Sequence, residues 1–343
     1  MAAHSVGTKL LPESIYWTQL LGKEHFRGFG QGYYVWLPLW QFVLAGLYLA
    51  TGIDTMLGGI VVSATSLGFM SLITVLVLKR AHFDRRHQIL GATLLLTSGY
   101  LVAYASQGMT DVFSAMLLFG STYYLFLYLG SGSGRYLAGA SVLTLLNAMT
   151  RYEAWLFLVI ALFYALYLFA SRRLTRGTLF NIILYSVPSV FFILIWLYYN
   201  ELVSGSFFGF ASWISRNVVQ FPPAFSYSPM MTLLNFAEVL LLSNGLFWLA
   251  LVDFSGKETV VTAMTRFGAL LFLGYSVFFL YSTYVGFSNG WVRLYLYFVP
   301  FSVVSFMSKD YRGEVFYLIL GISIVLGILG FAQNAVMNQV ASP

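Results

Sequence analysis

Long apolar segments separated by short polar connections run through most of the chain. A helix that crosses the hydrocarbon core of a bilayer needs about 20 mainly apolar residues. The pattern predicts ten such spans, which we place at residues 56–78, 88–106, 112–130, 137–150, 154–170, 178–199, 230–252, 263–285, 294–308 and 315–332. An eleventh apolar segment, 34–50, opens with Trp36, Pro38 and Trp40. Because tryptophan gathers at membrane interfaces, this segment suits a helix lying at the interface as well as a span.

Composition points to the same fold class. Of the 343 residues, 59% are hydrophobic and only 9% are charged, and the mean hydropathy is +0.80. A soluble globule needs many more charged residues to cover its surface. We therefore predict an all-α, polytopic integral membrane protein in contact with a lipid bilayer. Its predicted parts are an outer-loop-like segment with an interfacial helix at 1–55, a transmembrane helical domain at 56–332 and a C-terminal tail at 333–343.

The charge, cysteine and histidine counts narrow the range of ligands. The formal net charge is +6, but the basic residues are scattered through short loops, so nucleic acid is not an expected partner. The cysteine count of 0 removes thiolate metal sites and cysteine nucleophiles. The histidines form no ligand pair at helical spacing. We therefore assign no metal-binding residues.

Basic residues also predict the orientation, because they favour cytoplasmic loops. The connection after the first span is placed inside by Lys79, Arg80, Arg85 and Arg86. The later basic clusters then also fall inside, namely Arg135, Arg172 with Arg173 and Arg176, Lys257 with Arg266, and Lys309 with Arg312. Between 106 and 332, the basic residues left on the outer side are Arg151, Arg216 and Arg293.

Arg151 lies in the run Asn147-Ala148-Met149-Thr150-Arg151-Tyr152-Glu153-Ala154-Trp155, between two apolar stretches. A charge near the hydrocarbon costs at least about 2.5 to 3.5 kcal/mol, so it is normally kept where it faces a partner, a cavity or a site. Arg151 and Glu153 are two positions apart and would not face each other on a continuous helix, which favours a bend between two helices. The planar fork of arginine suits phosphate. Arg151 and Arg293 together indicate an anion site.

Two further acids are candidates for chemistry. Asp111 begins a span after Gly108-Met109-Thr110. The helix dipole favours a carboxylate there, so capping by Asp111 or Thr110 is the alternative to a functional role. Glu13 suits a general base, which needs a carboxylate within reach of the attacking hydroxyl. It can act at the outer face only if residues 1–33 lie outside, and the charge rule leaves their side open.

Several short motifs follow one another along nearly the whole chain. They are Tyr34-Val35-Trp36-Leu37-Pro38-Leu39-Trp40 with Gly52-Ile53-Asp54, the span 56–78 ending in Lys79-Arg80, Gly108-Met109-Thr110-Asp111, Thr150-Arg151-Tyr152-Glu153, and the segment from Arg293 to Pro300. In this order they resemble the GT-C membrane glycosyltransferases, in particular the branch with protein O-mannosyltransferases and lipid A aminoarabinose transferase. Enzymes of that family take a sugar from a polyprenyl-phosphate carrier at the outer membrane face.

The resemblance implies roles for the motif residues. Asp111 would help to build the acceptor-binding or metal-binding part of the site, while Arg151 and Arg293 would bind the carrier phosphate, with Glu153 and Tyr295 also in contact with substrate. A divalent cation is compatible with this set, although the sequence does not require one. The family's catalytic base is an acid just after the first transmembrane helix, and its nearest match is Glu13, which no apolar span precedes. A chain that starts late and a degenerate member both fit this departure.

The expected activity is an inverting glycosyl transfer. A carboxylate, from Glu13 or Asp111, would deprotonate a hydroxyl of a protein, lipid or glycan acceptor, which attacks the sugar of a dolichyl- or undecaprenyl-phosphate donor. The arginines would stabilise the leaving phosphate. The enzyme would lie in the plasma membrane with its site on the outer face. The alternative is a non-catalytic subunit, a lipid-handling protein or a transporter of the same architecture, and the lack of an internal repeat disfavours transport.

Overall fold

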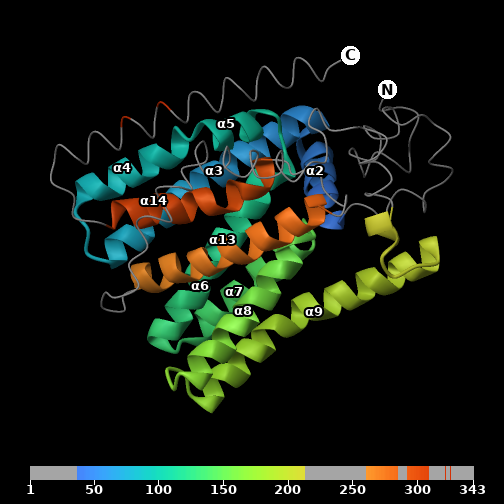
Figure 1. Ribbon diagram of the computed structural model, residues 1–343. Coiled ribbons are helices and arrows are strands. Elements are labelled where there is room, and N and C mark those ends of the chain that lie inside the picture. The colour runs from blue at the N-terminus through green and yellow to red at the C-terminus, as the bar shows by residue number, and fades with distance from the viewer. Residues whose placement is uncertain (1–36, 213–259, 285–291, 309–320, 322–324, 326–343) are drawn as a thin grey trace.

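The computed structural model describes residues 37–212, 260–284 and 292–308, together with residues 321 and 325. Every regular element in these ranges is a helix (Figure 1). The helices are α2 (Pro38–Thr51), α3 (Thr55–Arg80), α4 (Arg85–Leu96), α5 (Gly99–Ser106), α6 (Thr110–Ser131), α7 (Gly134–Ala148), α8 (Glu153–Ala170), α9 (Arg176–Ser204), α13 (Val260–Tyr284), the 3-10 helix η3 (Val292–Phe298) and α14 (Val299–Met307). The prediction of an all-α fold is confirmed for the described residues.

Five of these helices are long and apolar enough to cross a membrane, namely α3, α6, α8, α9 and α13. They coincide with the predicted spans 56–78, 112–130, 154–170, 178–199 and 263–285. The predicted spans 230–252 and 315–332 lie outside the described residues. The described helices are therefore those of a helical membrane protein, and the total of ten spans stays a prediction.

The predicted span at 88–106 is divided into two helices, α4 and α5. Helix α4 ends at Leu96, where the Thr97 hydroxyl donates a hydrogen bond to the carbonyl of Thr93 at 2.8 Å. Ser98 then leaves the helical region, with φ −63° and ψ 108°, before α5 begins. Threonine and serine hydroxyls compete with the backbone for hydrogen bonds, and hydropathy alone does not register this effect.

Two other predicted spans form short elements. The segment 137–150 corresponds to α7, which has 15 residues. The segment 294–308 is divided between η3 and α14, with Pro300 in the first turn of α14. Proline is tolerated at that position because the first N–H groups of a helix have no partner within the helix.

Helix α2 is too short to span a bilayer. Its 14 residues reach about 21 Å at 1.5 Å per residue, against a hydrocarbon core of about 30 Å. One side is buried through Trp40, while Phe42 and Leu49 on the other side are 56% and 69% exposed. Such a helix fits the interfacial interpretation of 34–50 better than the spanning one.

Helix α6 is the centre of the bundle. It packs against α3, α7, α8, α13 and η3. Of the residues in its apolar 18-residue stretch, 78% are buried. By contrast, α9 runs along the edge of the bundle (Figure 1), and only 22% of the residues in its apolar 18-residue stretch are buried. Its large apolar side chains are exposed, as Phe180, Phe191 and Leu194 show. Exposure of these apolar side chains is favourable in the hydrocarbon of a bilayer and unfavourable in water.

The two ends of the bundle differ in charge. Arg80 at the end of α3 lies over the ring of Tyr136 at the start of α7, 5.9 Å from its centroid. The basic ends of these helices therefore lie together, as the orientation rule requires. Helix α6 joins this end to the opposite one, about 33 Å away for its 22 residues. Asp111 lies at that opposite end, in the first turn of α6.

Two glycines allow the backbone before α6 to cross α3 at close range. Gly108 has φ +65°, and a Cβ on it would lie 2.9 Å from the backbone of Gly59. A Cβ on Gly59 would lie 2.9 Å from the carbonyl oxygen of Gly108. Next to this contact, the Ser63 hydroxyl donates to the Met109 carbonyl at 2.9 Å. The crossing therefore fixes where α6 begins, and with it the position of Asp111.

Replacing Gly108 by Ala is expected to destabilise the protein through two effects. The left-handed φ costs about 1 to 2 kcal/mol for a residue with a Cβ, and the new methyl group meets backbone atoms of α3 that cannot move aside. Gly132 is a matched control, because it has φ +70° and no atom within 4 Å of a Cβ. Thermal unfolding in detergent should rank Gly108→Ala well below Gly132→Ala. Equal losses in the two variants would show that the close crossing contributes nothing to stability.

Candidate functional site

A break between α7 and α8 places Arg151. The N–H groups of Thr150 and Arg151 both donate to the carbonyl of Asn147, at 2.9 and 3.1 Å, which closes the last turn of α7. The Thr150 hydroxyl donates to Leu146 at 2.7 Å. Helix α8 then begins at Glu153. The predicted bend is therefore present, and it turns Arg151 and Glu153 toward each other although they are two residues apart.

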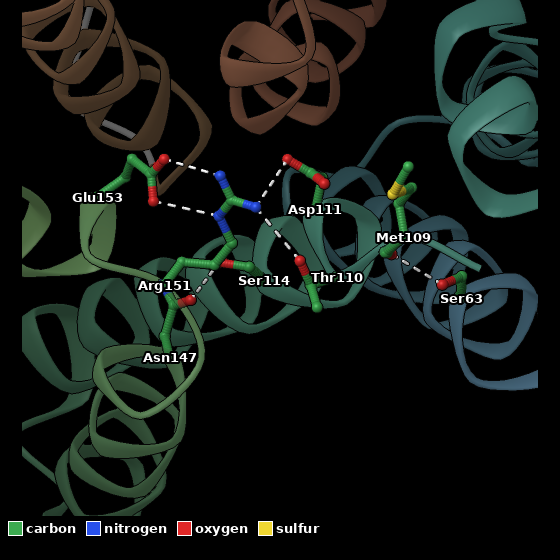
Figure 2. A network of polar contacts seen from close by, with 8 residues as sticks. All are labelled: Ser63, Met109, Thr110, Asp111, Ser114, Asn147, Arg151 and Glu153. Atoms are coloured by element: carbon green, nitrogen blue, oxygen red, sulfur yellow. Dashed lines mark hydrogen bonds and ion pairs between the residues drawn. The ribbon is translucent and has the colours of Figure 1, made fainter. Parts of the chain in front are cut away.

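The guanidinium of Arg151 holds Glu153 in a two-point contact. Its Nε donates to Glu153 Oε2 at 3.1 Å, and its Nη2 donates to Glu153 Oε1 at 2.8 Å (Figure 2). This pairing of a planar fork with a carboxylate is the strong, orientation-specific form of an arginine ion pair. The side chains of Arg151 and Glu153 are 11% and 15% exposed.

The third nitrogen of the same guanidinium faces the start of α6. Arg151 Nη1 donates to the Thr110 hydroxyl at 3.2 Å and lies 3.2 Å from Asp111 Oδ1 (Figure 2). The side chain of Asp111 is 1% exposed. Helix α6 has Met109 at its N-cap and no side-chain cap hydrogen bond. Neither Asp111 nor Thr110 is therefore the N-cap residue, although Asp111 still lies in the first turn, where the helix dipole favours a carboxylate.

We call Thr110, Asp111, Arg151 and Glu153 the arginine cluster. Burial disfavours the charged form of Arg151, but the carboxylates of Asp111 and Glu153 outweigh that effect and hold its pKa well above the ordinary range. The formal charges of Asp111, Arg151 and Glu153 sum to −1. These three side chains have little contact with water, so their charges are weakly screened and interact strongly.

Uncharged polar groups lie next to the arginine cluster. The Ser114 hydroxyl, one turn along α6 from Thr110, donates to Asn147 Oδ1 at 2.5 Å (Figure 2). From α13, the Tyr275 hydroxyl donates to the backbone carbonyl of Glu153 at 2.5 Å. Helix η3 packs against α6, and the phenol of its buried Tyr297 contributes to the raised pKa of Arg151. The cluster is thus held by elements from four parts of the chain.

Aromatic side chains form a wall beside the cluster. The ring of Tyr152 stacks on Phe210, with centroids 4.0 Å apart and planes 6° from parallel. Trp155 packs edge-on against Tyr152. The Trp196 indole N–H donates to the Tyr152 hydroxyl at 3.1 Å, which ties α9 to the bend. Tyr152 is therefore held in place by packing and a hydrogen bond, and it fixes the backbone between Arg151 and Glu153.

The other predicted site residues have different outcomes. Glu13 lies outside the described residues, as does the side chain of Arg293, whose backbone belongs to η3. The ring of Tyr295 packs against Phe272 and Phe279 of α13. Among the described residues, no group of three or more His, Cys, Asp or Glu side chains could hold a metal ion. The structure thus brings together Asp111, Arg151 and Glu153 from the predicted set.

Four polar residues beside the cluster were not predicted as parts of the site, namely Asn147, Ser114, Tyr275 and Tyr297. Asn147 had a usable signal, because a buried amide four residues before an arginine in an apolar segment calls for a polar partner. Tyr297 lies two residues after Tyr295, and in a 3-10 helix this step turns the side chain by about 240°. Tyr275 stands in an apolar helix with many aromatic residues and carries no distinguishing signal.

The fold and site define a helical membrane protein with a largely buried arginine-carboxylate cluster at one end of its apolar helices. Comparisons with protein-family models, curated proteins and solved structures found no match to the chain.

Replacing Arg151 by Met is expected to destabilise the protein strongly. Removing one partner of a buried ion pair costs about 3 to 5 kcal/mol, because the remaining charge stays buried. Adding Asp111→Asn to Arg151→Met should recover part of this loss, since one of the uncompensated carboxylates is then neutral. Unfolding in detergent, measured for the two single variants and the double variant, gives the coupling between the two side chains.

Arg135→Met is the matched control for this cycle. Arg135 is exposed at the opposite end of the bundle and contacts the ring of Tyr136. Its replacement should change stability by no more than about 0.5 kcal/mol. Strictly additive losses from Arg151→Met and Asp111→Asn would mean that the two charges do not stabilise each other.

Proposed function

We propose that the protein transfers a sugar from a polyprenyl-phosphate donor to a hydroxyl acceptor at the outer face of the membrane, with inversion at the sugar carbon. The observation that carries this proposal is the position of Arg151. A guanidinium with low exposure lies at the ends of apolar helices, and the phosphate of a membrane-embedded lipid is expected near such helix ends. Arginine is well suited to that phosphate because its fork donates two parallel hydrogen bonds.

The arrangement of the predicted motifs supports the proposal. Gly108-Met109-Thr110-Asp111 and Thr150-Arg151-Tyr152-Glu153 are separated by about 40 residues, yet their side chains contact one another. These motifs carry the resemblance to the GT-C membrane glycosyltransferases. A functional site built from both motifs explains why charges are kept here, where a purely structural helix junction would need none.

Unused hydrogen-bonding capacity beside the cluster also suits a polar ligand. Within the described residues, Asn147 Nδ2 is buried without a hydrogen-bond partner. Buried polar groups are normally paired, and an exception calls for an explanation. A sugar or acceptor hydroxyl at the arginine cluster would supply a partner to this amide.

The proposed chemistry uses the cluster to stabilise charge. The acceptor hydroxyl attacks the anomeric carbon, the bond from that carbon to the phosphate oxygen breaks, and the hydroxyl proton passes to a carboxylate. Negative charge develops on the leaving phosphate, and a prepositioned guanidinium lowers the energy of that charge. In this scheme Arg151 holds the phosphate and Asp111 fixes the guanidinium and orients the acceptor. Glu13 is the proposed base.

Sugar transfer by the purified protein tests the proposal. With a mixture of polyprenyl-phosphate sugars as donors, we expect Arg151→Ala and Asp111→Asn to lower the transfer rate at least about 100-fold, the size of effect seen when one group that stabilises a developing oxyanion is removed. Arg135→Ala, at the opposite end of the bundle, should transfer at the parental rate.

Thermal unfolding of each variant separates lost chemistry from lost folding. Transfer by Arg151→Ala and Asp111→Asn at the parental rate would rule out the assignment. Binding of the lipid phosphate without any transfer in the parent protein would favour a lipid-handling or non-catalytic role instead.

A further inference from the structure

The arginine that would bind the carrier phosphate already holds an anion from its own chain. Two of its three nitrogens donate to the two oxygens of Glu153, at 3.1 and 2.8 Å. Those donors, Nε and Nη2, form the edge of the guanidinium that a phosphate would use for a two-point contact. Ligand and Glu153 therefore compete for the same edge of Arg151.

The third nitrogen stays engaged whichever anion occupies that edge. Nη1 lies 3.2 Å from both the Thr110 hydroxyl and Asp111 Oδ1. Asp111 is buried in the first turn of α6, so it holds the guanidinium from the side opposite to Glu153. Loss of the Glu153 contact thus leaves Arg151 positioned, with its free edge toward the ligand.

The backbone of Glu153 is held independently of its carboxylate. The Tyr275 hydroxyl donates to its carbonyl at 2.5 Å, and Ala154 in the next position is buried. The side chain of Glu153 is 15% exposed, whereas that of Asp111 is 1% exposed. Rotation of the Glu153 side chain therefore releases the edge of Arg151 without moving α8.

The charge of the cluster raises the cost of admitting an anion. Asp111, Arg151 and Glu153 sum to −1, and a phosphodiester would make the total −2 as long as Glu153 stays ionised. The bound anion and the carboxylate of Glu153 would both lie next to Arg151, and like charges so close together repel strongly where water is scarce. An anion must therefore replace the Glu153 contact fully to bind here.

We infer that Glu153 is a specificity-determining residue. Its carboxylate occupies the phosphate-binding edge of Arg151 and excludes anions that make fewer hydrogen bonds there than a phosphate ester does. This inference rests on the proposed function. A lipid carboxylate offers Arg151 only what Glu153 already provides, so it gains nothing by exchange. A phosphate ester gains, because its additional oxygens can also accept hydrogen bonds, for example from Asn147 Nδ2, which has no partner among the described residues.

Binding of a short lipid phosphate tests the role of Glu153. The full chain in detergent is titrated with geranylgeranyl phosphate, with a C20 fatty acid as the carboxylate, and with geranylgeraniol as the uncharged chain. We expect Glu153→Gln to bind geranylgeranyl phosphate about tenfold or more tightly than the parent, since one charge-assisted contact no longer has to be broken. It should also bind the fatty acid, which the parent excludes, while geranylgeraniol binding stays unchanged.

Three further variants make the result interpretable. Glu153→Ala should behave as Glu153→Gln does, which guards against an amide that still occupies the edge. Glu201→Gln removes one carboxylate from α9 near the same end of the bundle, and it should bind as the parent does. Glu153→Gln combined with Arg151→Ala should lose the gain, which assigns that gain to the guanidinium.

The outcomes separate this inference from the proposed function. Equal or weaker phosphate binding by folded Glu153→Gln and Glu153→Ala, with binding still dependent on Arg151, would overturn the role of Glu153 and leave the phosphate site standing. Failure of every variant to prefer geranylgeranyl phosphate over geranylgeraniol would instead reject the phosphate site itself.

Discussion

The paired charge of Arg151 is the constraint on which the candidate site depends. An arginine with low exposure among apolar helices needs compensating charge, and Asp111 and Glu153 supply it from two directions. Much of the surrounding structure serves this contact. The break after α7 turns Arg151 and Glu153 toward each other, and the crossing of Gly108 over Gly59 sets the start of α6. Without these backbone features the same residues would lie on separate helix faces.

Hydropathy predicted the long helices well because lipid imposes one requirement on all of them. A spanning helix must satisfy its own backbone and present apolar side chains, and α3, α6, α8, α9 and α13 do so. The method failed where a local polar interaction decided the outcome. Thr97 and Ser98 divide the segment 88–106 through hydroxyl and backbone geometry, although their effect on average hydropathy is small.

The residues of the candidate site that could be predicted are those of a type that is rare in an apolar chain. Arg151, Asp111 and Glu153 stand out because charges are rare here, and the prediction brought them to one membrane face. Their pairing with each other was not predicted, because the planar fork of arginine pointed to an external anion as its partner. Tyr275 contacts Glu153 through one hydroxyl, and no sequence pattern separates it from the other aromatic residues of α13.

The hydrogen bond from Tyr275 to Glu153 joins residues 122 positions apart, whereas Thr110 and Arg151 are 41 positions apart. During synthesis, α6, α7 and α8 are therefore made well before α13. Asp111, Arg151 and Glu153 all lie in this early segment, so their charges can neutralise one another before the rest of the bundle is made. Tyr275 is made later, and its hydroxyl can join the site only then. The order of residues along the chain thus allows the charged side chains to pair first and the site to be completed last.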